Sequence, residues 1–157
     1  MDQAIVQHVK QNYNILLGEV SAEQVKIDIG SACPMGDDRS YAVSGRDLIA
    51  GLPRTVMVTS DEIREALQEP VRQILGAIRG VLEKTGPELS GDLVQNGITL
   101  CGGGVLLKGL PELIHSETGL PVEVTEDPIT AVVRGIAVFL ERLDDFKHVL
   151  ENGEDEL

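Results

Sequence analysis

Three consecutive glycines near the middle of the chain constrain its fold more than any other feature. A short apolar run at residues 98–101 precedes the glycines at 102–104, and an apolar pattern with helical spacing begins at Val105. This order predicts a buried strand, a glycine turn and a helix. Because glycine has no Cβ and tolerates positive φ, such a turn lets the backbone approach a ligand closely. An ordinary strand-to-helix turn without a ligand explains the same residues.

The glycine stretch lacks the full signatures of two common phosphate-binding loops. A dinucleotide-binding loop has three spaced glycines and a distant acidic residue, and a P-loop has a lysine followed by serine or threonine. Neither pattern surrounds residues 102–104. The class of ligand therefore stays open from these residues alone.

The apolar patterns divide the chain near Ser60. Residues 1–59 predict a small unit of helices followed by a hairpin. Residues 60–145 alternate between helix and strand, which predicts an α/β layer. Residues 146–157 are rich in Glu and Asp, and we expect this acidic tail to be disordered.

The α/β part contains too few strands to close a sheet by itself. Only residues 98–101 and 121–124 read as good strands there, and Cys101 in the first of them is expected to be a small core residue. Two parallel strands alone leave unpaired edges. We therefore expect an incomplete sheet whose partner strands come from elsewhere, and whose edge favours self-association.

The charge of the chain excludes some classes of partner. The formal net charge is −13, from 26 acidic and 13 basic residues. A nucleic-acid binder needs a basic face, so we expect no nucleic-acid partner. Anionic lipid is disfavoured for the same reason. The sequence shows no signal peptide and no apolar run of the ~20 residues that a membrane span needs, so a cytoplasmic protein is expected.

The side chains show no arrangement typical of catalysis or metal binding. Cys33 and Cys101 lie far apart and lack the paired spacing of a metal site. His8, His115 and His148 are scattered along predicted helices, without a nearby acid and nucleophile. We therefore expect neither a catalytic residue nor a metal ligand within this chain.

A set of short motifs points to a known family when the motifs are taken together. They lie at residues 2–5, 12–14, 18–19, 22–26, 29–32, 45–48, 51–54, 65–70, 87–89, 97–110, 117–122 and 126–132. In combination they resemble the C-terminal half of the bacterial actins of the rod-shape-determining MreB family, from Met1 to about Leu140. The resemblance implies half of an actin-like, ribonuclease H-like ATPase fold of the α/β class. Residues 1–59 would be the small outer subdomain and residues 60–145 the larger subdomain.

The resemblance also implies an adenosine site made by two segments. The glycine turn would line the adenine and α-phosphate side of ATP through Gly102, Gly103, Gly104 and Val105. The second adenosine-contacting helix would contribute Glu23, Gln24, Val25 and Lys26. The three-residue spacing of Glu23 and Lys26 puts both side chains on one helix face. A surface ion pair of little energetic value is the alternative interpretation of these two residues.

Some positions depart from the family pattern. The family usually has Arg or Lys where Gln24 stands, which weakens an expected charged contact. It often has Ala or Ser where Val105 stands, and the bulkier Val105 would narrow the adenine pocket. It often has Thr in place of Cys101.

The resemblance places other functional elements before Met1. These are two phosphate-binding turns, the catalytic acid, the Mg²⁺ site and the membrane-binding element. The whole protein is then expected to be a slow ATPase, cytoplasmic and membrane-associated, that polymerises with copies of itself. The cytoplasmic domain of a rod-shape-machinery membrane protein is a further partner that the family implies. The chain alone is expected not to hydrolyse ATP.

Two other functions fit parts of the sequence. A sugar-kinase-like enzyme of the same superfold would share the glycine turn, although the helix at residues 12–13 and the hairpin at residues 45–48 look like MreB. A nucleotide-free interaction module would use the folded half without any ligand. Nucleotide titration separates this last alternative from the actin-like one.

Overall fold

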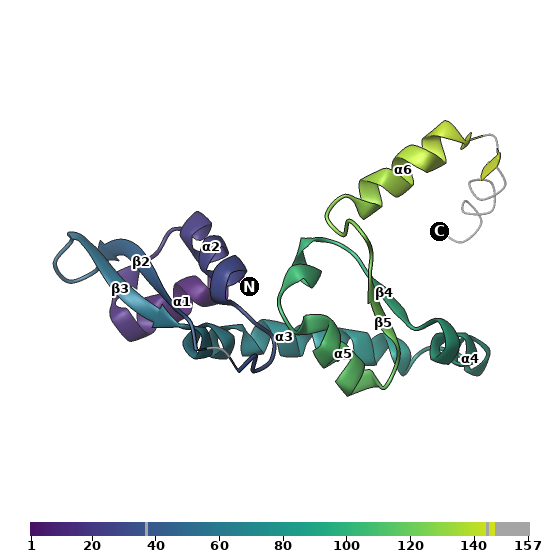
Figure 1. Cartoon of the computed structure of the whole chain (residues 1–157), viewed down its shortest axis with the longest axis horizontal. Helices are drawn as coiled ribbons and strands as arrows, with labels where there is room; N and C mark the ends of the chain where they lie inside the picture. The colour runs from purple at the N-terminus through teal and green to yellow at the C-terminus, as the bar shows by residue number, and fades with distance from the viewer. Residues whose placement is uncertain (37, 144, 147–157) are drawn as a thin grey trace.

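The computed structural model describes residues 1–36, 38–143 and 145–146. The molecule is elongated, and one long helix joins its two ends (Figure 1). The elements follow one another in this order: α1 (Asp2–Tyr13), β1 (Ile15–Leu16), α2 (Glu19–Ile29), β2 (Ser40–Asp47), β3 (Pro53–Thr59), α3 (Ser60–Leu82), α4 (Pro87–Asn96), β4 (Ile98–Leu100), the 3-10 helix η1 (Gly103–Leu106), α5 (Leu110–Thr118), β5 (Val122–Val124) and α6 (Ala131–Glu141). The tail was predicted at residues 146–157, and all of it except Phe146 lies outside the described residues.

The N-terminal end of the molecule is a three-stranded antiparallel sheet covered by α1 and α2. The strand order is β1-β2-β3, and β2 pairs with β3 from Ser40 opposite Thr59 to Arg46 opposite Pro53. Ile5 of α1, Val25 of α2 and Val43 of β2 are buried in the shared core. These aliphatic side chains bury the apolar stripe of each helix against one face of the sheet, which stabilises all three elements together.

The hairpin between β2 and β3 closes around Asp47. Its carboxylate accepts hydrogen bonds from the backbone N–H groups of Ile49 (2.8 Å) and Ala50 (2.9 Å) and pairs with Arg54 at 3.0 Å. The N–H groups of Ala50 and Ile49, together with Arg54, hold the pKa of the Asp47 carboxyl below its usual range. Asp47 therefore organises the turn through hydrogen bonds that a short polar side chain makes to its own backbone.

Helix α3 links the two ends of the molecule. Thr59 and Glu62 form a capping box at its N-terminus, with each side chain bonding the other residue's backbone N–H. Pro70 lies inside the helix, which nevertheless runs without a break from Ser60 to Leu82. Ile63, Leu67 and Val71 are buried on one side of it. The packing of this stripe supports the helix through the position where Pro70 removes a backbone hydrogen bond.

The C-terminal end contains the incomplete sheet expected from the sequence. Strands β4 and β5 pair in parallel, with Ile98 opposite Val122 and Leu100 opposite Val124. Among the described residues these two strands pair only with each other. Parallel strands are normally buried on both faces. Here Ile98, Leu100, Val122 and Val124 are only half-buried, and Cys101 is exposed. The prediction that Cys101 is a core residue is wrong, because β4 ends at Leu100 and nothing described packs over the residue that follows.

Helix α6 stands away from the rest of the fold (Figure 1). It begins at Ala131 and carries large apolar side chains that are mostly exposed, including Val132, Val133, Ile136 and Leu140. An apolar helix face of this kind is normally buried against another element. The C-terminal end of the molecule therefore offers apolar surface on a strand edge and on a helix.

No helix among the described residues is long and apolar enough to cross a membrane.

Candidate functional site

The glycine turn leads out of β4 and is held by a bond to the segment after β5. Gly102 has φ +89°, a conformation that favours glycine, and its N–H donates to the carbonyl oxygen of Pro128 at 2.6 Å. Gly103 then begins η1, which ends at Leu106. The expectation of one helix starting at Val105 is wrong. Leu107 is extended and Gly109 has φ +74°, so the α-helix starts only at Leu110.

The second and third glycines of the turn leave open space above the backbone. A Cβ atom added to Gly103 or to Gly104 would meet no heavy atom of the rest of the chain within 4 Å. Neither residue has the positive φ that Gly102 has. The fold of this chain therefore requires glycine at 102 for its conformation, but it requires no glycine at 103 or 104. Open backbone at these two positions is what a closely approaching ligand needs.

Helix α2 carries the other predicted site residues in different environments. Glu23 is exposed, and Gln24 donates to the Asp28 carboxylate at 2.9 Å. Val25 is fully buried in the core. Its side chain positions the helix, so only its backbone is available to a ligand. Lys26 forms an ion pair with Asp2 at 2.7 Å, in a geometry that is not that of an aligned hydrogen bond. Val105, on η1, is half-buried.

The structure joins the end of α2 to the segment that follows the glycine turn. The ammonium Nζ of Lys108 donates to the carbonyl oxygen of Asp28 at 2.7 Å. The N–H of Ala32 donates to the carbonyl oxygen of Lys108 at 2.8 Å. Asp28 lies two residues after Lys26, and Lys108 lies two residues after the end of η1. In Figure 1 the bend that contains η1 lies on the side of the molecule that faces α2.

Sequence reasoning did not identify Asp28 and Lys108 as part of this arrangement. The available signal was Lys108 itself, a single cation directly after the apolar residues 105–107. Arg39 was missed as well; its guanidinium Nη1 donates to the same Asp28 carbonyl at 2.6 Å. A helix C-terminus attracts cations, but which cations reach it depends on segments distant in sequence.

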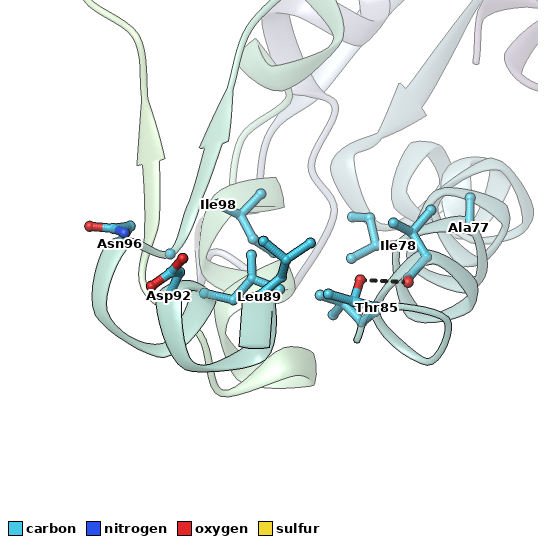
Figure 2. A pocket seen from close by; sticks show the side chains of 11 residues that line it. Ala77, Ile78, Thr85, Leu89, Asp92, Asn96 and Ile98 are labelled. Carbon is cyan, nitrogen blue, oxygen red and sulfur yellow. Dashed lines mark hydrogen bonds between the residues drawn. The ribbon is translucent and has the colours of Figure 1, made fainter. Parts of the chain in front are cut away.

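A separate apolar groove lies between the C-terminal half of α3, helix α4 and the start of β4 (Figure 2). It has a volume of about 690 Å³ and is lined mainly by aliphatic side chains, among them Ile78, Val81, Leu82, Leu89, Leu93 and Ile98. Asp92 is its one charged lining residue. The groove contains none of the predicted site residues.

The part of the chain that the structure describes offers no ready metal centre. No group of three or more His, Cys, Asp or Glu side chains is close enough there to hold an ion.

The fold and the glycine turn together define the chain as one with an actin-like fold. The crystal structure of Spiroplasma citri MreB5 bound to ADP superposes with a TM-score of 0.85 at 35% identity, covering 90% of this chain and 43% of that one. The MamK double helical filament gives a TM-score of 0.67 at 19% identity, covering 82% of this chain and 39% of that one, and supports the fold alone.

The sequence comparison is more specific. The family model described as MreB/Mbl protein matches residues 1–148, so the chain belongs to the MreB/Mbl family. The cell shape-determining protein MreB of Escherichia coli K12 is 47% identical over 143 residues, which cover 91% of this chain. The same match covers 41% of the E. coli protein, so the chain spans less than half the length of this relative.

Proposed function

We propose that this chain forms the adenosine side of the nucleotide cleft in a cell-shape-determining, filament-forming actin. The observation that carries the proposal is the open space beside the backbone of Gly103 and Gly104. The packing of the chain itself does not require glycine at these two positions. The junction between Lys108 and Asp28 supports it, because it holds the end of α2 against the segment that follows the glycine turn and η1. The solved MreB5 of S. citri binds ADP in one structure and AMPPNP in another.

In this proposal two segments contact the nucleoside. The glycine turn lies along adenine and the α-phosphate through Gly102, Gly103, Gly104 and Val105. Glu23 and Lys26 approach ribose and base from α2, with Gln24 beside them and Val25 contributing backbone only. The division of the chain into residues 1–59 and 60–145 is part of the same proposal.

In this proposal, the groups that act on the phosphates of the nucleotide lie in another part of the whole protein. Family members such as E. coli MreB are more than twice as long as the match, and we propose that the remaining part supplies the phosphate turns, Mg²⁺ and the catalytic acid. The same part would cover the apolar groove, because parallel sheets are normally buried on both faces. It would also pair with the free edge of β4, because two strands are too few for a stable sheet. The whole protein would be a slow ATPase, and the chain alone would bind nucleotide without turnover.

Self-association and localisation follow from the same proposal. A head-to-tail contact that does not close generates a filament, and self-assembly is expected of the whole protein. The whole protein is expected to be cytoplasmic and membrane-associated, with the cytoplasmic domain of a rod-shape-machinery membrane protein as a further partner.

Calorimetric titration with ADP tests the nucleotide part of the proposal. We expect saturable binding by the wild-type chain and loss of binding in Gly103→Val, whose side chain would fill the open space. Gly91→Val is the matched control, because Gly91 on α4 also has no neighbour within 4 Å of an added Cβ. Equal binding by Gly103→Val and wild type would contradict the assignment of the glycine turn.

A nucleotide-free interaction module remains the second candidate, and one observation favours it. The large apolar side chains of α6 are exposed together with the apolar groove. Absence of any ADP binding by the wild-type chain, combined with capture of a protein partner through these surfaces, would support this candidate. The sugar-kinase alternative is not retained, because the family that matches is MreB/Mbl.

A further inference from the structure

The C-terminal end of α2 is held by cations from two directions. The carbonyl oxygen of Asp28 accepts a hydrogen bond from Lys108 Nζ at 2.7 Å and another from Arg39 Nη1 at 2.6 Å. The last four carbonyls of a helix have no partner within the helix, and the helix dipole makes this end negative. Positive side chains there satisfy the free carbonyl and the dipole together. Arg39 comes from the segment before β2, whereas Lys108 comes from the segment after the glycine turn.

A second contact between the same segments involves backbone. Ala32 donates its N–H to the Lys108 carbonyl at 2.8 Å, and Ser31 and Lys108 form an isolated parallel bridge. The thiol of Cys33 lies 3.7 Å from the carbonyl oxygen of Gly109. Residues 31–33, after α2, and residues 107–109, after η1, thus form a junction, and Ser31 and Leu107 are buried within it.

The Lys108 side chain adds a second point of attachment to this junction. The backbone bond and the bridge hold Lys108 beside Ser31 and Ala32, just after the end of α2. The ammonium of Lys108 reaches the carbonyl oxygen of Asp28, which lies inside α2 and four residues before Ala32. One attachment lies inside α2 at Asp28 and the other lies beyond its last residue, Ile29, so the two hold the end of α2 at separate points.

We propose that Lys108 is a positioning residue for the nucleotide site. Lys108 itself does not contact the nucleotide. Its positioning role rests on the proposed function. Its ammonium holds α2, with Glu23 and Lys26, in a fixed orientation relative to Gly102, Gly103 and Gly104. Loss of the ammonium removes one attachment and lets the C-terminal end of α2 shift relative to residues 107–109, although the core packing keeps both segments folded.

The two native thiols report on the junction. Cys33 is half-buried in it, and Cys101 is exposed beside Gly102, so Cys101 serves as an internal reference. The experiment measures alkylation of each thiol by iodoacetamide, resolved by peptide mass spectrometry, on the full 157-residue chain. Lys108→Met removes the charge and keeps an apolar stem of similar length.

We expect Cys33 in Lys108→Met to be alkylated about tenfold faster than in wild type, because a hydrogen bond to a charged group has been lost. Cys101 is expected to react at an unchanged rate. Lys108→Arg restores slow alkylation of Cys33, because the guanidinium also donates to the Asp28 carbonyl. Lys84→Met is the matched control, since it removes the same charge from an exposed lysine beyond the end of α3. If Lys108→Met does not fold by circular dichroism, Lys108→Gln takes its place.

The second measurement is ADP affinity by calorimetry. We expect about tenfold weaker binding in Lys108→Met, recovery in Lys108→Arg and no change in Lys84→Met. Rescue by Lys108→Arg separates positioning by the cation from a merely structural role of the side chain.

Three outcomes would overturn the proposal in different ways. Unchanged Cys33 alkylation in Lys108→Met means that the ammonium does not hold the junction. Faster alkylation with unchanged ADP affinity means that the junction does not position the nucleotide site. Failure of the wild-type chain to bind ADP overturns the proposed function and with it the nucleotide role of Lys108, while the thiol rates still decide whether Lys108 orients α2.

Discussion

Tyr13 at the end of α1 donates a hydrogen bond of 2.5 Å from its hydroxyl to the Glu62 carboxylate at the start of α3. Glu62 also accepts from the N–H of Thr59 at 2.8 Å and from the Thr59 hydroxyl at 2.9 Å. One carboxylate thus closes the N-terminus of the longest helix and ties it to the first helix of the chain. Because α3 joins the two ends of the molecule, this contact fixes α1 and α3 relative to each other.

The hydrogen bond shifts the pKa values of both partners. The bond to Glu62, followed by burial and by the charge of Glu62, raises the pKa of Tyr13 to about 12. Burial acts to raise the pKa of Glu62, but the hydrogen bonds from Tyr13 and Thr59 together outweigh it and leave that pKa lowered. The ionised carboxylate and the neutral phenol are therefore the forms that the folded state favours.

Tyr13→Phe is expected to lower the free energy of unfolding by about 1 kcal/mol, because it removes one hydrogen bond and keeps the ring. Urea denaturation at neutral pH measures the change. Tyr41→Phe is the control, since Tyr41 is the other tyrosine of the chain. The prediction is wrong if both variants have the same stability as wild type.

The pH dependence of stability follows from the same pair. The folded-state pKa of Tyr13 is raised above its ordinary value of 10.0, so its contribution is complete below pH 10 and is lost as the pH rises toward about 12. The folded-state pKa of Glu62 is lowered from 4.5, so its contribution is complete above that pH and is lost as the pH falls below it. Urea midpoints measured across both ranges test this. In Tyr13→Phe the alkaline loss should be smaller than in wild type, and an identical alkaline profile would contradict the assignment.

Thr59→Ala is expected to destabilise the chain by about 1 kcal/mol, because it removes the side-chain oxygen that caps α3. Thr59→Ser keeps this oxygen and should retain most of the stability. Thermal denaturation of the two variants beside wild type gives the comparison. Equal melting temperatures for Thr59→Ala and Thr59→Ser would show that the cap contributes little.

Two glycines at the ends of α5 give a matched pair of substitutions. Gly119 has φ +69° and no neighbour within 4 Å of an added Cβ, so Gly119→Ala should cost about 1 kcal/mol of conformational strain alone. Gly109 has φ +74°, and an added Cβ would overlap the Cys33 sulfur. Gly109→Ala should therefore cost more than Gly119→Ala in urea denaturation.

A double substitution isolates the steric part of that difference. Cys33→Ala combined with Gly109→Ala removes the overlapping sulfur, and the excess cost should then shrink toward the value for Gly119→Ala. A double variant no more stable than Gly109→Ala alone would mean that the junction between residues 31–33 and 107–109 is not tight at this point.

Local patterns identified the elements whose ends are set by neighbouring residues. The capping box of Thr59 and Glu62 is such a local signal, because its bonds span only three residues. The hairpin predicted within residues 1–59 is present as β2 and β3, and the second strand is rich in β-branched residues. The helix expected from Val105 was placed wrongly, since the extended backbone of Leu107 and the positive φ of Gly109 interrupt it. Residues 107–109 contact residues 31–33, which lie far outside the local pattern.

What the sequence determined by itself is the α/β class, the deficit of strands and the family resemblance, because these rest on periodicity, glycine placement and motifs. Only the tertiary structure decided that Cys101 is exposed, that Val25 is buried in the core, and that Lys108 reaches Asp28. Residues 28 and 108 meet because packing of the shared core brings α2 and the segment before α5 together. Contacts between positions so far apart in the sequence depend on how whole elements pack, and no local sequence pattern predicts that packing.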